Sequence, residues 1–297
     1  MNCYDCPIMC GADRTAGETG ACGVGERAYI ARAARHYYEE PPISGVRGSG
    51  AVFFMGCNMR CVFCQNIDIS TAGSDPYRGA LPADASALAD IMLRLQELGS
   101  HNINLVTPTP HIRLICEAIP LARERGLYIP IVYNTNGYER AESLKLLEGL
   151  IDIYLPDLKY VSPRLAERFS GRADYFEYAS AALEEMQRQA GVLRTDEEGI
   201  AVKGLIVRHL VLPCAVDETR RVLDHIASAL PKETYISLMS QYTPIPGMKR
   251  PLDRRITHAE YRRAVDHATA LGFENIFIQS MSSADPSFTP EFNGSFE

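Results

Sequence analysis

The sequence lacks several features that would assign it to large classes of protein. It carries a net charge of −7, so no excess of positive charge is available to hold nucleic acid. Its apolar runs are far too short to span a bilayer, and we expect no membrane association. The first residues show neither the basic nor the apolar region of a signal peptide, which predicts a reducing cytoplasmic location. No G-x-G-x-x-G follows an apolar run, which argues against a dinucleotide-binding fold.

Cysteine, in contrast, is abundant, with nine in 297 residues. Without an export signal these cysteines are expected to be reduced metal ligands rather than disulfides. Cys57, Cys61 and Cys64 form the pattern C-x3-C-x2-C directly after the apolar run 51–55. Three thiolates on one short loop suit a 4Fe-4S cluster and leave one iron open for chemistry. A zinc loop or three buried structural thiols are the alternatives, and the position after a strand-like run favours the cluster.

After about 50 residues the sequence alternates between strand-like and helix-like segments. The strand-like segments are expected at 51–56, 102–107, 128–133, 152–156, 204–212, 234–241 and 275–279. The helical segments are expected at 84–98, 113–125, 140–147, 175–189, 218–230 and 258–271. This repetition predicts parallel strands covered by helices, in either an open doubly wound sheet or a barrel.

The cysteine loop after the first of these strands resembles that of the radical S-adenosylmethionine (radical SAM) superfamily. The resemblance implies an α/β fold with a partial (β/α)6-type TIM barrel over residues 49–280. Residues 1–48 would form a small metal-binding module and linker, and residues 281–297 a C-terminal tail. In a barrel of this kind the site lies at the carboxyl ends of the strands. The family position of Phe63 implies that its ring packs near the adenine of SAM.

Polar residues follow five successive expected strands, and some of them extend the resemblance. Thr135-Asn136-Gly137, Asp157-Leu158-Lys159 and the run Arg208-His-Leu-Val-Leu-Pro resemble the pyruvate formate-lyase activating-enzyme branch. The similarity covers most of residues 49–277. It implies that Lys159 and Arg208 hold SAM, and both are suited to carboxylate or ribose oxygens. Asp157 would bind ribose hydroxyls or orient Lys159, and Asn136 would also contact SAM; a structural surface pair is the alternative.

Two departures from that branch affect the expected substrate. Where the family carries Gly-Gly-Glu for the SAM amino group, this chain has Thr107-Pro108-Thr109-Pro110, so hydroxyls or carbonyls of Thr107 and Thr109 must serve instead. The aspartate associated with a cation in the activases is Asn134 here, which weakens a monovalent cation site. These differences place the chain in a divergent, activase-like subgroup.

A second group of cysteines precedes the expected barrel, at Cys3, Cys6, Cys10 and Cys22. Four thiolates within twenty residues suit a closed metal site, and zinc, iron and a second iron-sulfur cluster all accept four thiolates. A structural zinc or single iron is our first expectation. So short a module cannot build its own core, so a metal would supply much of its folding energy.

The sequence thus predicts a radical SAM enzyme that cleaves SAM reductively to a 5'-deoxyadenosyl radical and abstracts a hydrogen atom. The resemblance implies an activase-like oxidoreductase that acts on a glycyl radical enzyme and takes its electron from a reduced flavodoxin- or ferredoxin-like protein. Modification of a peptide or small molecule is the alternative within enzymes. An iron-sulfur electron carrier or metal-binding interaction protein is the alternative outside them.

Overall fold

A single sheet organises the fold in the computed structural model, which describes residues 2–71, 79–284, 290–292 and 296. The strands lie in the order β10-β9-β8-β6-β5-β4-β2-β1-β3, with β7 paired to β8. Their bounds are β1 Ala28–His36, β2 Ser49–Phe54, β3 Leu81–Ala83, β4 Ile103–Val106, β5 Ile131–Thr135, β6 Ile153–Pro156, β7 Arg194–Thr195, β8 Ala201–Leu210, β9 Tyr235–Met239 and β10 Ile276–Ile278.

Most of the sheet is parallel, as the alternation of strands and helices predicts. β2, β4, β5, β6, β8, β9 and β10 pair in parallel, while β1 is antiparallel to β2 and β3 is antiparallel to β1. Within the described residues the sheet does not close, because β10 and β3 end it without pairing to each other. The fold is therefore an α/β partial barrel, which confirms the predicted fold class.

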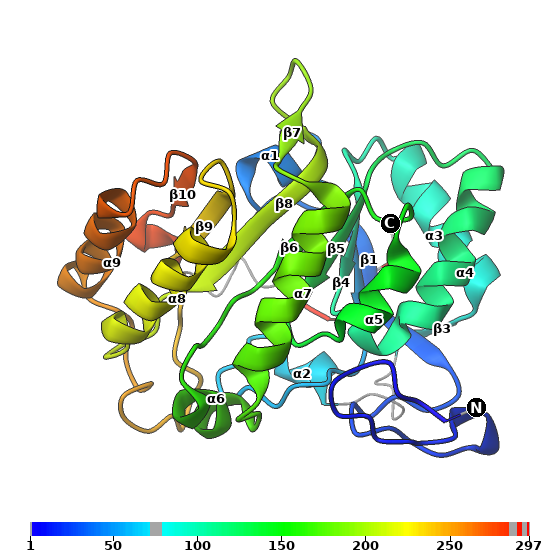
Figure 1. The fold of residues 1–297 in the computed structure, drawn as a ribbon. Coiled ribbons are helices and arrows are strands. Elements are labelled where there is room, and N and C mark those ends of the chain that lie inside the picture. Colours follow the sequence, from blue (N-terminus) through cyan, green and yellow to red (C-terminus); the bar gives the residue numbers. More distant parts are fainter. Residues whose placement is uncertain (1, 72–78, 285–289, 293–295, 297) are drawn as a thin grey trace.

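Helices cover the outer face of this sheet (Figure 1). Their bounds are α1 Pro41–Ser44, α2 Ile67–Ser70, α3 Ala85–Glu97, α4 Ile112–Glu124, α5 Ala141–Leu144, α6 Pro163–Ser170, α7 Tyr175–Ala190, α8 Val216–Ala229 and α9 His258–Ala270. Local chemistry sets several ends: Asp84 caps α3 by accepting from the Ala87 N–H, and Thr257 and Glu260 form a capping box on α9. These helices bury aliphatic side chains such as Leu88 and Ile115 against the strands.

The two ends of the barrel differ in what covers them. In Figure 1, α1 lies at the amino ends of the parallel strands, while α2 and the N-terminal segment lie at their carboxyl ends. Ile43 of α1 is fully buried and packs with Val132, Ile153 and Ile206 from β5, β6 and β8. The amino end is therefore filled by apolar side chains, and the carboxyl end is left for a site.

The sequence-based prediction did not include β1, which lies inside the segment expected to be module and linker. β1 pairs with β2 from Ile30 to His36, so the sheet extends into that segment. In the expected C-terminal tail, Phe292 contacts Phe53 edge to face and Phe296 forms a bridge with Ala33. Residues 285–289, 293–295 and 297 of that tail lie outside the described residues. The proposed boundaries of the three segments remain predictions.

Candidate active site

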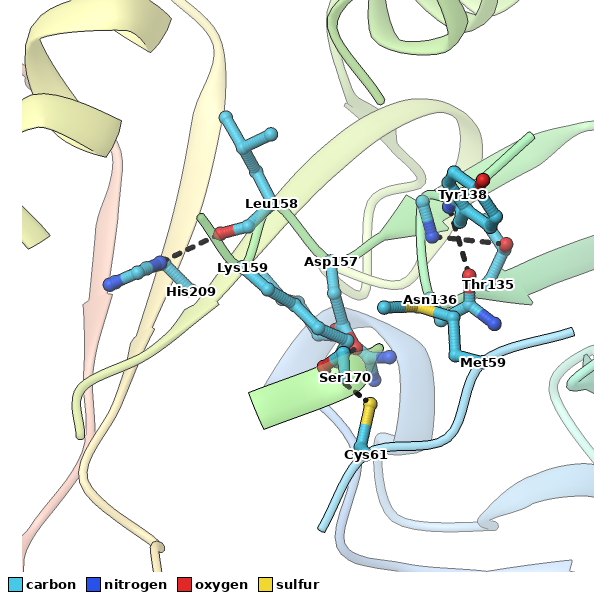
Figure 2. A network of polar contacts seen from close by, with 12 residues as sticks. Met59, Cys61, Thr135, Asn136, Tyr138, Asp157, Leu158, Lys159, Ser170 and His209 are labelled. Atoms are coloured by element: carbon cyan, nitrogen blue, oxygen red, sulfur yellow. Dashed lines mark hydrogen bonds and ion pairs between the residues drawn. The ribbon is translucent and has the colours of Figure 1, made fainter. Parts of the chain in front are cut away.

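The loop that carries Cys57, Cys61 and Cys64 follows β2 and is held by two other segments. Asn136, after β5, donates to Cys57 Sγ at 3.5 Å. Ser170, at the end of α6, lies 3.0 Å from Cys61 Sγ, as Figure 2 shows. The Asn58 side chain donates to the Tyr138 carbonyl at 2.7 Å and so fixes the middle of the loop. Hydrogen bonds to the sulfur atoms favour thiolates, the form in which cysteine binds iron.

Burial dominates the electrostatics of these thiols. It raises the pKa of Cys57 to about 12, and the neighbouring Cys61 and Cys64 add to the effect. Burial also raises the pKa of Cys61, which the nearby Lys159 ammonium opposes. Cys57 and Cys61, in a site of low dielectric constant, resist ionisation unless a cation neutralises them. The donor set therefore fits an iron-sulfur cluster, whose irons would provide that charge.

Asp157, Lys159 and Arg208 form one largely buried ionic group near these thiols. Asp157 Oδ2 accepts from Lys159 Nζ at 2.5 Å, and Oδ1 accepts from Arg208 Nε at 2.9 Å. Burial alone would raise the pKa of the Asp157 carboxyl, but the two cations hold it below its usual value. Figure 2 shows Asp157 and Lys159 extending toward the Cys61 loop. Asp157 forms an ion pair with Lys159, and both side chains are only 16% exposed, so this is not a surface pair. Contact between Asp157 and the ribose of SAM remains a prediction.

These residues share a cavity of about 720 Å³. The predicted site residues that line it are Cys57, Cys61, Cys64, Phe63, Thr107, Asn134, Asn136, Asp157, Lys159 and Arg208. Phe63 is buried, and its ring meets the ring of Tyr242 at a centroid distance of 6.2 Å. Gln241 and Ser237 also line the cavity, together with Glu39 and Glu40 from the segment before α1. Sequence reasoning missed the two glutamates because Glu-Glu-Pro-Pro is typical of a linker.

Thr109 is placed differently from the other predicted site residues. It is buried, is absent from the described lining of the cavity, and donates to Glu139 Oε1 at 2.5 Å. Thr135 donates to the same oxygen at 2.5 Å, and Tyr133 does so at 3.3 Å. Contact between Thr109 and SAM remains a prediction, whereas its hydroxyl supports the strand ends through Glu139.

The buried Glu139 carboxyl group should make the free energy of unfolding depend on pH. Burial raises its pKa to about 7 from an ordinary 4.5, although three hydroxyl donors oppose the rise. Because the folded state binds this proton more tightly than the unfolded state, the stabilisation is full below pH 4.5 and is lost as the pH rises to 7. We expect the free energy of unfolding of the wild type to fall by about 3 kcal/mol relative to Glu139→Gln over that window.

Urea denaturation of both proteins at several pH values measures that difference. Glutamine keeps an acceptor for the hydroxyls and does not titrate, so the variant isolates the effect of the carboxyl group. A constant difference in the free energy of unfolding between pH 4.5 and 7 would contradict the assignment to Glu139.

The N-terminal cysteines lie on a loop that packs against the candidate active site. The Cys22 carbonyl accepts a hydrogen bond from the Cys57 N–H at 3.2 Å. The Asp5 carboxylate accepts hydrogen bonds from two nitrogens of the Arg113 guanidinium. Cys3, Cys6 and Cys22 are buried, whereas Cys10 is exposed. A Cβ at Gly20 would lie 3.5 Å from Cys10 Sγ and 3.3 Å from Cys22 Sγ. A side chain at position 20 would press on both sulfur atoms and on the Arg14 guanidinium, which donates to Cys22 Sγ at 3.3 Å.

No group of three or more His, Cys, Asp or Glu side chains in the described part of the chain is arranged to hold one metal ion. A second metal at the four N-terminal cysteines is therefore not shown. The result does not exclude a cluster at Cys57, Cys61 and Cys64, because several irons spread their ligands further apart than one ion does. Among the described residues, no helix is both long and apolar enough to cross a membrane.

Known proteins resemble this chain both in sequence and in structure. Residues 51–192 match the model of the radical SAM superfamily. The structure of Streptococcus suis SuiB superposes with a TM-score of 0.52 at 14% identity, over 78% of this chain and 50% of SuiB. Residues 51–192 are therefore a radical SAM superfamily domain. The superfamily implies a 4Fe-4S cluster and SAM, and the three loop thiols with their donors fit that cluster.

Two further proteins are similar to this chain, one in sequence and one in structure. The uncharacterized protein MJ0674 of Methanocaldococcus jannaschii is 31% identical over 93% of this chain and 77% of its own length. The structure of anSMEcpe with bound S-adenosylmethionine and a Kp18Cys peptide has a TM-score of 0.50 at 12% identity, over 74% of this chain and 60% of that one. This chain spans about half the length of SuiB, and the structural likenesses show the fold alone.

Proposed function

We propose that this protein cleaves SAM reductively at a 4Fe-4S cluster on Cys57, Cys61 and Cys64, and then abstracts a hydrogen atom from a substrate. The observation that carries the proposal is that these thiols share one cavity with Phe63 and with the Asp157, Lys159 and Arg208 group. When bound, the cluster supplies an open iron for the methionyl amino and carboxylate groups and the electron that divides SAM into methionine and a 5'-deoxyadenosyl radical.

The protein side chains would bind and orient SAM. Lys159 keeps two N–H groups beyond its bond to Asp157, and these suit the methionyl carboxylate. Phe63 offers an aromatic face for the adenine. Asn136, Thr107 and Asn134 line the same cavity and would donate to or accept from the ribose and the amino group.

Exclusion of water is a further requirement, because a primary radical attacks whatever surrounds it. Phe53, Phe54, Met59 and Met239 line the cavity and are buried. These apolar side chains would confine the radical to the substrate. A cavity with an ionic group on one wall and apolar side chains on others suits a nucleoside with an amino-acid tail.

The substrate that we propose is a backbone glycine of a partner enzyme, which makes this an activase-like radical SAM enzyme. Support comes from the strand-end motifs Thr135-Asn136-Gly137, Asp157-Leu158-Lys159 and Arg208 with the residues that follow it. A reduced flavodoxin- or ferredoxin-like protein would supply the electron. We also propose that Cys3, Cys6, Cys10 and Cys22 hold a second metal, supported by the position of Cys10 Sγ and Cys22 Sγ on either side of the same point next to Gly20.

Electron paramagnetic resonance tests the choice of substrate. The reconstituted protein, SAM and a reductant are incubated with a glycyl radical enzyme from the same genome. A glycyl radical that depends on SAM supports the proposal. Formation of 5'-deoxyadenosine without a glycyl radical would favour a peptide or small-molecule substrate, and absence of both products would favour an electron carrier.

A further inference from the structure

Glu39 reaches the cavity from the amino end of the barrel, opposite the thiols. It lies between β1 and α1, and Figure 1 shows α1 at the end of the strands remote from α2. Its side chain is 12% exposed and lines the cavity. The residue therefore enters the interior of the barrel from a segment that does not belong to the parallel strands.

Three donors from three different strands converge on the Glu39 carboxylate. Asn104 of β4 and Asn134 of β5 donate to Oε1 at 3.0 and 3.1 Å. Arg208 of β8 donates from Nη1 to Oε2 at 3.2 Å. Both oxygens of a carboxylate accept hydrogen bonds. A glutamine side chain would place its NH2 group, which only donates, against at least one of these three donors. The position therefore selects an acidic residue.

Arg208 connects Glu39 to the group that faces the thiols. Its Nε donates to Asp157, its Nη1 to Glu39 and its Nη2 to Asn134 Oδ1 at 2.6 Å. Asp157 in turn holds Lys159 through its other oxygen. A continuous path of charge-assisted hydrogen bonds thus runs from Glu39 to Lys159.

We propose that Glu39 is a positioning residue for SAM, which acts through Arg208 and Asp157 to hold Lys159 in place. This inference rests on the proposed function, in which Lys159 binds the methionyl carboxylate. Asp157 is shared by two cations, and Glu39 is the second carboxylate that forms an ion pair with Arg208, near the buried Glu40. Without that anion, Arg208 would compete with Lys159 for Asp157, and the ammonium would lose its fixed direction.

Equilibrium binding of SAM to the cluster-reconstituted protein tests this proposal in a double-mutant cycle of Glu39→Gln and Lys159→Met. We expect Glu39→Gln to weaken SAM binding about tenfold, within the range of coupled neighbours. The double variant should bind no more weakly than Lys159→Met alone, because Glu39 acts only through Lys159. A merely structural glutamate would instead give additive losses of affinity.

Glu185→Gln is the matched control. Glu185 is buried on α7, and its carboxylate also accepts hydrogen bonds from an arginine, Arg188, and from a side-chain amide, that of Gln189. It does not line the cavity. Its variant should keep wild-type affinity for SAM. Glu39→Asp retains a carboxylate, and the cycle is run with it where Glu39→Gln does not fold.

The outcomes separate this inference from the proposed function. Wild-type SAM affinity in folded Glu39 variants, or losses that add to those of Lys159→Met, would overturn the role of Glu39 and leave the proposed function standing. Wild-type affinity in Lys159→Met would overturn the proposed role of Lys159, and the positioning role with it. Non-additive losses, with the Glu185 control unaffected, would establish the positioning role.

Discussion

Replacing Asp157 with asparagine is expected to lower the free energy of unfolding by about 3–5 kcal/mol and to abolish SAM binding. The carboxylate lies 2.5 Å from Lys159 and 2.9 Å from Arg208, and its side chain is only 16% exposed. An asparagine would leave two buried cations facing each other without their shared anion. Urea denaturation and equilibrium SAM binding measure the two effects.

Asp152→Asn provides the control at the opposite end of the same strand, since Asp152 precedes β6 and Asp157 follows it. Asp152 pairs with Arg123 at 3.0 Å, and both side chains are about one-third exposed, at 36% and 33%. Its loss should cost no more than about 1 kcal/mol and leave SAM binding unchanged. Equal effects of the two variants would mean that the buried ionic group has no special role.

Gly137→Ala is expected to be the most disruptive change in the candidate active site that adds a single methyl group. Gly137 has a φ of +83°, and a Cβ there would lie 2.2 Å from the Asp157 carbonyl oxygen. Neither backbone can yield without moving Asn136, which precedes Gly137, or Lys159, which lies two residues after Asp157. We expect destabilisation by about 4 kcal/mol or more, together with loss of SAM binding.

Gly149→Ala separates the steric clash from the cost of the backbone conformation. Gly149 has a φ of +80°, and an added Cβ would have no neighbour within 4 Å. It should cost only the left-handed conformation, about 1–2 kcal/mol. If urea denaturation showed the same loss for both variants, close packing of Gly137 on Asp157 would not be what the glycine provides.

Much of the fold could be predicted from the sequence, because β2, β4, β5 and β6 are short runs buried on both faces. The rule that sites lie at the carboxyl ends of such strands brought Asn136, Asp157 and Lys159 together correctly, although they follow different strands. β1 was missed because Ala28–His36 contains two arginines and four alanines, a composition with little strand propensity.

Residues that act across long separations in sequence could not be predicted in the same way. Glu39 and Arg208 are 169 positions apart, and nothing in Glu39-Glu40-Pro41-Pro42 indicates that the carboxylate turns into the barrel. Thr109 meets Glu139 through a tertiary contact that no local pattern signals. Such polar contacts depend on how the strands are placed side by side, which the full fold determines.

The central claim is that Cys57, Cys61 and Cys64 support reductive cleavage of SAM. The most direct test is to purify and reconstitute the protein anaerobically, add dithionite and SAM, and measure 5'-deoxyadenosine against a Cys61→Ala control. We predict that the wild type forms 5'-deoxyadenosine and that the variant does not. An intact cluster whose spectrum SAM leaves unchanged, with no 5'-deoxyadenosine formed, would contradict the claim.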